Sequence, residues 1–294
     1  MIDRSIMRRG GGNAVPPAVL AFLLAATLLV AALLTSVPSA HAAAGTGGAI
    51  DSPASFARSA EPAPLAHSAQ VPAEPTPPPA PTITEPVSLS GENDRWRWSF
   101  VLRATDARAE PRSDSSVLMR LRKLTPERTA NLVLVLERQT VGGQQWLRVR
   151  LPMLPNNSTG WVPRQALGGY ETVTTHLFVD TKRLRLRLER RGRTVLRARI
   201  GVGEKRWPTP TGEFYVRNEL RGFDSPIYGP VAFGTSARSA VLTDWPGGGF
   251  VGIHGTNRPG ILPGRVSHGC IRLRNPDIRR LARLMPVGTP ITVT

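Results

Sequence analysis

The sequence predicts a mainly β protein with two folded parts in series and one short helix. Short apolar runs alternate with polar residues from Arg95 onward, and Gly, Pro and Asn separate these runs. Only the stretch around residues 275–285 has the apolar spacing of a helix. Residues 1–94 show neither pattern. The 294-residue chain is therefore expected to contain a targeting segment, a linker and two modest domains.

Residues 1–42 have the pattern of an export signal. An apolar run covers residues 18–34, and small residues follow in an A-x-A pattern that ends at Ala42. The segment before the run carries Arg4, Arg8 and Arg9. We expect a cleaved signal peptide or, alternatively, an uncleaved N-terminal membrane anchor. Both place the remaining chain outside the cytoplasm, secreted or membrane-anchored.

Residues 43–94 are rich in Ala, Pro, Ser and Glu, with seven prolines between positions 72 and 86. Proline lacks a backbone donor and favours extended conformations, so this segment is predicted to be a disordered, semi-rigid linker. A ligand for a proline-binding module is the alternative.

Residues 95–168 are predicted to form a small β-barrel. Leu132–Leu136 has the composition of a buried strand, and Trp146–Leu151 alternates apolar and charged residues. Gly142-Gly143 lies between them, as in a hairpin, and turn residues 155–160 precede another short strand. The segment contains no His or Cys, so we do not expect catalysis there.

Residues 172–294 are predicted to form a second β domain. Alternation over 184–188 and the run 195–200 predict a hairpin, and Phe250–Ile253 is expected to be a strand that ends at His254. Asn275 is expected to cap the helix, with Pro276 in its first turn and Pro286 after its end.

The chain is strongly basic, with 38 Lys and Arg against 21 Asp and Glu and a formal charge of +17. Such a charge attracts polyanions, of which nucleic acid and an anionic cell envelope are the main kinds. Because the N-terminus predicts export, we expect the envelope as partner and no nucleic acid. Membrane contact is expected only through the N-terminal segment, if it is uncleaved.

Cys270 is the only cysteine, so it forms no intramolecular disulfide. A lone cysteine is commonly a buried, inert side chain, but two of the five histidines lie within sixteen residues of this one. A free thiol has a pKa of about 8.5, and a nearby imidazole can take its proton. His254 can return to the thiol across a loop, and Gly269 lets backbone amides approach a developing oxyanion. The cluster predicts acyl transfer through a thioester.

Two other interpretations fit the same residues. His254, His268 and Cys270 are three possible zinc ligands, although no acidic residue close in sequence offers a general base. In the second interpretation, both histidines are structural and Cys270 is a buried, inert side chain.

Residues 173–294 resemble the YkuD-type L,D-transpeptidase catalytic domain. The family motif is a histidine, a spacer of about fourteen to seventeen residues, and Ser/Thr-His-Gly-Cys followed by a hydrophobic residue and Asn or Arg. This chain has His254 and then Ser267-His268-Gly269-Cys270-Ile271-Arg272. Further matches are Pro210–Phe214, Tyr228-Gly229-Pro230 and Gly288-Thr289-Pro290. The resemblance implies a β-sandwich-like fold with one short helix.

The resemblance also implies the roles of the site residues. Cys270 attacks the carbonyl between the third and fourth residues of a peptidoglycan stem, and an amine of a neighbouring stem resolves the thioester into a 3→3 cross-link. His254 is the base, the carbonyl of Gly255 orients it, and His268 and Gly269 shape the anion hole. Arg272, Ser267 and Tyr228 are expected to contact substrate, with bracing of the loop as the alternative for Arg272.

The resemblance implies cell-wall association, no metal or cofactor, and acylation by carbapenem-type β-lactams. The same thioester resolved by water, a D-amino acid or a protein amine would give carboxypeptidase, exchange or anchoring activity. A non-catalytic wall-binding protein is the alternative of another class. Residues 95–168 resemble bacterial SH3-like domains through Trp146-Leu147-x-Val149 and Gly160-Trp161-Val162, which implies wall binding or orientation of the following domain.

Overall fold

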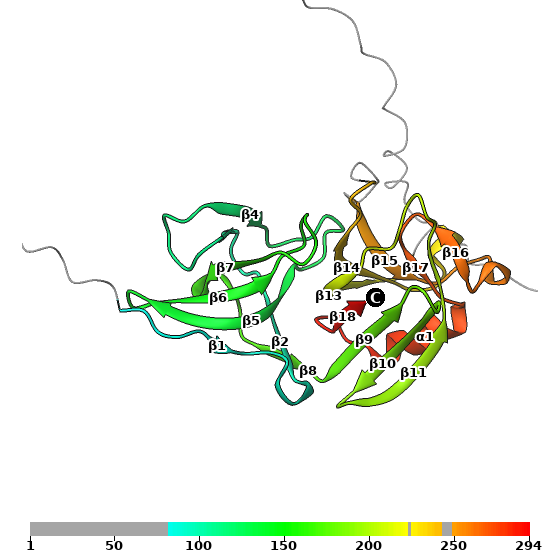
Figure 1. Ribbon diagram of the computed structural model, residues 1–294, viewed down its shortest axis with the longest axis horizontal. Helices are drawn as coiled ribbons and strands as arrows, with labels where there is room; N and C mark the ends of the chain where they lie inside the picture. Colours follow the sequence, from blue (N-terminus) through cyan, green and yellow to red (C-terminus); the bar gives the residue numbers. More distant parts are fainter. Residues whose placement is uncertain (1–81, 223–224, 243–248) are drawn as a thin grey trace, which may run out of the picture. The chain divides into compact units, whose positions relative to one another are not determined.

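The computed structural model describes residues 82–222, 225–242 and 249–294 (Figure 1). These residues all belong to one unit, Glu74–Thr294. The predicted signal or anchor at 1–42 and the linker up to residue 81 lie outside the described residues and stay predictions. None of the helices in the described ranges is long and apolar enough to cross a membrane.

An eight-stranded sheet makes up the first part of the described chain, in the order β4-β3-β7-β6-β5-β2-β8, with β1 also paired to β5. Its strands are β1 Val87–Ser88, β2 Trp96–Phe100, β3 Thr105–Arg108, β4 Val117–Leu121, β5 Leu132–Val141, β6 Gln144–Arg150, β7 Thr159–Pro163 and β8 Glu171–Val173. The predicted strands at 132–136 and 146–151 are confirmed as β5 and β6. Gly142 and Gly143 join them with φ values of 56° and 78°, which a tight hairpin requires. The SH3-like assignment itself stays a prediction.

The end of the segment predicted to be a linker belongs to this sheet. Val87 and Ser88 pair with Arg138 and Glu137 of β5, and the Ser90 hydroxyl donates to the Val135 carbonyl at 2.6 Å. The linker boundary at residue 94 is therefore wrong for residues 82–94. Two paired residues suffice for an edge strand, and so short a segment shows no clear alternation in the sequence.

A ten-stranded sheet makes up the second part, in the order β11-β10-β9-β18-β13-β14-β15-β17-β12-β16. Its strands are β9 Thr175–Asp180, β10 Arg185–Arg190, β11 Arg193–Arg199, β12 Gly201–Gly203, β13 Gly212–Leu220, β14 Ala232–Arg238, β15 Phe250–His254, β16 Gly264–Ser267, β17 Ile271–Arg272 and β18 Pro290–Val293. Figure 1 shows β9–β11 and β14–β17 on either side of β13 and β18.

Both halves of this sheet bury side chains in one core, which gives the predicted β-sandwich-like arrangement. Leu177 and Leu188 come from the β9–β11 half, and Phe233 and Ile253 from the other half; each is fully buried. The helix α1, Asn275–Leu284, packs onto the same core through Ile278 and Leu281. This single α-helix of the described residues confirms the predicted short helix.

Asn275 does not cap α1 as predicted. The N-cap position is Arg274, which makes no side-chain capping bond. The Asn275 side-chain oxygen instead accepts the backbone N–H of Thr256 at 3.0 Å. Asn275 therefore holds the chain just after β15 rather than the helix end, because the Thr256 amide would otherwise be left without a partner.

The two sheets make specific contacts within the Glu74–Thr294 unit. The Tyr215 hydroxyl of β13 donates to the Leu132 carbonyl of β5 at 3.2 Å. Arg217, also on β13, has a side chain only 2% exposed and pairs with Glu127 at 2.8 Å. A buried charge requires a partner of opposite charge. Glu127 lies in the segment between β4 and β5, so this ion pair joins the two sheets.

Candidate active site

Two adjacent parallel strands position the chemically important side chains. β15 and β17 are paired with Ile253 opposite Ile271 and His254 opposite Arg272. Alternate residues of a strand share a face, so Gly252 and His254 lie on the same face of β15. Cys270 stands directly before β17, beside Gly252. The strand register, rather than the connecting loop, therefore brings the cysteine and the histidine to one place.

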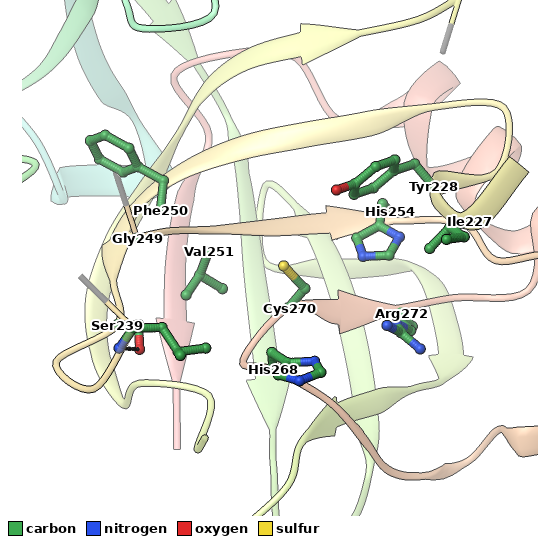
Figure 2. A pocket seen from close by; sticks show the side chains of 11 residues that line it. Ile227, Tyr228, Ser239, Gly249, Phe250, Val251, His254, His268, Cys270 and Arg272 are labelled. Atoms are coloured by element: carbon green, nitrogen blue, oxygen red, sulfur yellow. Dashed lines mark hydrogen bonds between the residues drawn. The ribbon is translucent and has the colours of Figure 1, made fainter. Parts of the chain in front are cut away.

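These residues line a cavity of about 250 Å³. Figure 2 shows the Cys270 sulfur and the His254 ring directed into the same space. The lining is mostly apolar and consists of Ile227, Tyr228, Ser239, Leu242, Gly249, Phe250, Val251, His254, His268, Cys270 and Arg272. Of the eight predicted site residues, five thus lie on one cavity, and Gly255, Ser267 and Gly269 lie directly beside its lining residues.

The surroundings of Cys270 favour the protonated thiol. Its Sγ accepts the backbone N–H of Gly252 at 3.4 Å. Burial raises the pKa of the Cys270 thiol, while the Gly252 N–H and the positive charge of Arg272 act in the opposite direction. A thiol with a raised pKa needs a base to become a nucleophile.

His254 has the tautomer that such a base requires. It is 3% exposed, and its Nδ1 lies 2.6 Å from the carbonyl oxygen of Gly255. Because a carbonyl only accepts, Nδ1 carries the proton, and Nε2 of the neutral ring has a free lone pair. Burial lowers the pKa of His254 to about 4; the Gly255 carbonyl opposes this shift and Arg272 adds to it. The imidazole is therefore neutral at pH 7.

No hydrogen bond joins Cys270 to His254 among the described residues. Hydrogen bonds between catalytic groups are often long without substrate and shorten when it binds. The geometry therefore corresponds to a thiol and a neutral imidazole on one cavity rather than to a preformed ion pair.

The lack of a side chain at Gly255 allows the close packing around this carbonyl. A Cβ on Gly255 would lie 2.4 Å from the Asn275 side-chain oxygen and 3.1 Å from the Gly229 Cα. The same oxygen accepts the Thr256 amide. A glycine at 255 is thus required for the close packing that positions the carbonyl facing His254 Nδ1.

Ser267 was expected to contact substrate, and the structure corrects this. The side chain is fully buried; its hydroxyl donates to the Cys270 carbonyl at 2.6 Å and accepts the Gly269 N–H at 3.2 Å. Ser267 therefore stabilises the conformation of residues 267–270, which we call the cysteine loop. Gly269 has a φ of +113°, a value that L-residues rarely adopt.

His268 lines the cavity. Its ring lies tilted against the Trp207 ring, with centroids 3.9 Å apart and an interplanar angle of 32°. The Arg206 guanidinium lies 3.6 Å from the centroid of the Trp207 ring. Trp207 was not predicted to belong to the site, since its only signal in the sequence is an aromatic residue directly before the Pro208-Thr209-Pro210 turn.

Thr209 was also missed, and it supports the cysteine loop from below. Its buried hydroxyl accepts the Gly203 N–H at 2.9 Å and donates to the Gly269 carbonyl at 2.8 Å. Thr209 thus fixes the peptide directly before Cys270, although sixty-one positions separate the two residues.

Arg272 and Tyr228 border the same cavity. Arg272 has a buried Nε that lacks a hydrogen-bond partner in the described structure. The Tyr228 ring is edge-on to His254, with centroids 5.1 Å apart. Both side chains therefore line the cavity together with Cys270.

The remaining histidine of the catalytic part has a structural setting. His176 Nε2 is 2.8 Å from the Thr292 hydroxyl, and its ring stacks on Phe178. Within the described ranges, no three His, Cys, Asp or Glu side chains gather closely enough to hold a metal ion. The geometry thus gives the zinc interpretation no support.

Comparisons with known proteins agree with this site. Residues 174–293 match the YkuD family model, described as the L,D-transpeptidase catalytic domain. The putative L,D-transpeptidase YkuD of Bacillus subtilis is 35% identical over 122 residues, which cover 42% of this chain and 67% of that protein. The Bacillus licheniformis protein of the same name is 34% identical over 124 residues, covering 42% and 68%.

Among solved structures, the Enterococcus faecium L,D-transpeptidase C442S mutant is 26% identical, with a TM-score of 0.32, over 41% of this chain. The match spans about half of that protein, 49% of its length. The residues matched by the family model, 174–293, contain both His254 and Cys270. The chain belongs to the YkuD family of L,D-transpeptidases.

Proposed function

We propose that the protein is an exported L,D-transpeptidase that cross-links peptidoglycan stems through a thioester on Cys270. The observation that carries the proposal is that Cys270 and His254 line the same cavity, with the imidazole held by its Nδ1 at the Gly255 carbonyl oxygen. Family membership supports the acyl-transfer class. Export rests on the N-terminal sequence.

In the first half-reaction, His254 Nε2 takes the thiol proton as Sγ attacks the carbonyl carbon between the third and fourth stem residues. The carbonyl oxygen becomes an oxyanion, which amides of the 268–270 loop stabilise. The Gly269 N–H must leave Ser267 Oγ to take part, since it is bonded there in this state. When the intermediate collapses, His254 returns the proton to the leaving D-amino acid amine, and an acyl thioester remains.

In the second half-reaction, an amine of a neighbouring stem attacks the thioester. His254 accepts a proton from that amine, and the sulfur leaves and is reprotonated. The product is an amide cross-link and the original thiol, so the enzyme needs no cofactor or energy source. Water, a D-amino acid or a protein amine would resolve the same intermediate by the same route.

Arg272 is proposed to bind a stem carboxylate. Its guanidinium borders the cavity, carries a buried donor without a partner in the described residues, and suits bidentate recognition. A positive charge also favours the anionic states of Cys270 and of the oxyanion.

Intact-protein mass spectrometry with a carbapenem tests the first half-reaction. The wild type is expected to gain the mass of one inhibitor, and Cys270→Ala none. His254→Ala should acylate about 10²–10⁴-fold more slowly, the usual range for loss of a general base. His176→Gln is the matched control and should acylate normally. Normal acylation of Cys270→Ala would exclude the proposal, and a wild type that forms no adduct would favour the non-catalytic alternative.

Incubation with a purified disaccharide-tetrapeptide identifies the acceptor. A cross-linked dimer with loss of one D-amino acid supports the transpeptidase. A tripeptide alone indicates carboxypeptidase activity, and a new terminal residue indicates exchange.

A further inference from the structure

The strands β11 and β10, at one end of the order of the ten-stranded sheet, carry an unusual concentration of arginine. β10 and β11 pair so that Arg185 faces Arg199 and Arg187 faces Arg197. The intervening Leu186, Leu188 and Leu196 are buried, so the four arginines project from the opposite, outer face. Like charges directly opposite each other destabilise a strand pair. A pairing with two such contacts in a row therefore favours a bound anion that offsets the repulsion.

The same residues line a groove of about 840 Å³. We define the arginine groove by the five arginines in its wall, Arg183, Arg185, Arg187, Arg197 and Arg199. Two acidic residues, Asp180 and Asp277, also line it. Positive charge thus predominates in a concave site.

The nearby carboxylates neutralise only part of this charge. Asp180 accepts the backbone N–H groups of Lys182 and Arg183 and pairs with the Arg183 side chain at 3.2 Å. Glu189 pairs with Arg187 at 2.7 Å. Arg185, Arg197 and Arg199 form no salt bridge within the part of the chain that the structure describes, and all three are exposed.

One guanidinium is already oriented for binding. The Arg187 head lies 4.0 Å from the centroid of the Phe178 ring, and its Nε is bonded to Glu189. Its two terminal nitrogens are thereby held in a fixed plane, which suits recognition of a phosphate. Arg197 is the cross-strand neighbour of this oriented group.

The spacing fits a polymer better than a single ion. Successive outward residues of a strand are about 7 Å apart, and opposite residues about 5 Å. The two arginine pairs therefore form successive steps along which linked phosphates can lie. Insertion into a bilayer needs exposed apolar side chains, and the exposed large hydrophobic residues of the described chain lie elsewhere. We propose that the arginine groove binds a linear phosphate-bearing polymer outside the catalytic cavity.

Linear polyphosphate is the probe that tests this site in the full-length protein. Arg185→Glu/Arg199→Glu should weaken binding at least about tenfold and lower the slope of log affinity against log salt by about 1.5, as expected for two lost contacts. Arg122→Glu/Lys123→Glu changes the charge equally on two exposed residues that directly follow β4, and it should weaken binding less than about threefold. Arg185→Gln/Arg199→Gln, with folding checked by circular dichroism, should weaken binding in the same direction.

The outcomes separate the occupant and the two proposals. Absence of polyphosphate binding, or equal losses in both charge-reversed variants, would overturn the proposal. So would equal competition by inorganic phosphate at the same phosphate concentration, or tighter binding to anionic phospholipid vesicles. Cys270→Ala should bind the polymer like the wild type, and the Arg185/Arg199 variants should still be acylated by a carbapenem. Failure of the groove therefore leaves the catalytic proposal intact.

Discussion

Single residues at the cavity determine the protonation chemistry, and their environments give it a pH dependence. Burial lowers the pKa of both His254 and His176 to about 4. Both histidines are neutral in the folded protein at pH 5–7, whereas an unfolded chain titrates near 6.5. Below pH 6.5 the unfolded state thus binds protons that the folded state excludes.

We therefore expect the two histidines to leave the free energy of unfolding unchanged between about pH 6.5 and 8 and to lower it as the pH drops from 6.5 towards 4. The buried His254 contributes a slope of about 1.4 kcal/mol per pH unit within that window. Urea unfolding at pH 7.5, 5.5 and 4.5 measures this. His254→Gln should reduce the slope of unfolding free energy against pH, and only the contribution of His176 should remain. An unchanged slope in that variant would contradict the lowered pKa of His254.

Thr209 is expected to affect both stability and acylation. Thr209→Val leaves the Gly203 N–H and the Gly269 carbonyl buried without a partner, at a cost of about 1–3 kcal/mol for each group. The cysteine loop loses its support, so carbapenem acylation should slow as well. Thr209→Ser keeps the hydroxyl and should restore the acylation rate. If Val and Ser variants acylate alike at a temperature where both are folded, Thr209 does not position the loop.

At the scale of elements, β15 shapes the space above the nucleophile. A Cβ on Gly252 would lie 3.4 Å from the Phe233 carbonyl and 3.9 Å from Cys270 Sγ, which are ordinary contacts. Gly252→Ala should therefore fold and acylate. Gly252→Val adds two methyl groups beside the sulfur and should reduce acylation at least about tenfold by obstructing near-attack geometry. Equal rates for both variants would show that the carbonyl approaches from another side.

The sequence predicted the elements that carry this site, but not their supports. Alternating Leu residues identified β10, and the run ending at His254 identified β15, because burial on one face leaves a period of two. Trp207, Thr209 and Asn275 contact the motif from other segments, and one sequence holds no record of which distant residues meet. Asn275 was assigned to a local cap because local rules were the only ones available. Ser267 was assigned to substrate because the motif showed its position but not its burial.

For the molecule as a whole, the contact between the two sheets includes a buried charge, the guanidinium of Arg217. Arg217 pairs with Glu127 and lies 3.7 Å from the Phe250 ring centroid, and Phe250 lines the cavity. Glu127→Ala would leave this guanidinium buried and unpaired, which typically costs about 3–5 kcal/mol. Thermal and urea unfolding measure the loss. Arg217→Met combined with Glu127→Gln removes both charges and should recover most of it; a double variant as unstable as Glu127→Ala would contradict this account.

Because β15 and β17 pair directly, the segment that connects them does not determine the positions of His254 and Cys270. Since interstrand hydrogen bonds align His254 with Arg272, residues 257–263 can change length while sulfur and imidazole keep their separation. A Cβ added at Gly260 would have no heavy atom within 4 Å apart from its chain neighbours. A short peptide tag inserted there should therefore leave the pairing of β15 with β17 and the acylation of Cys270 unchanged.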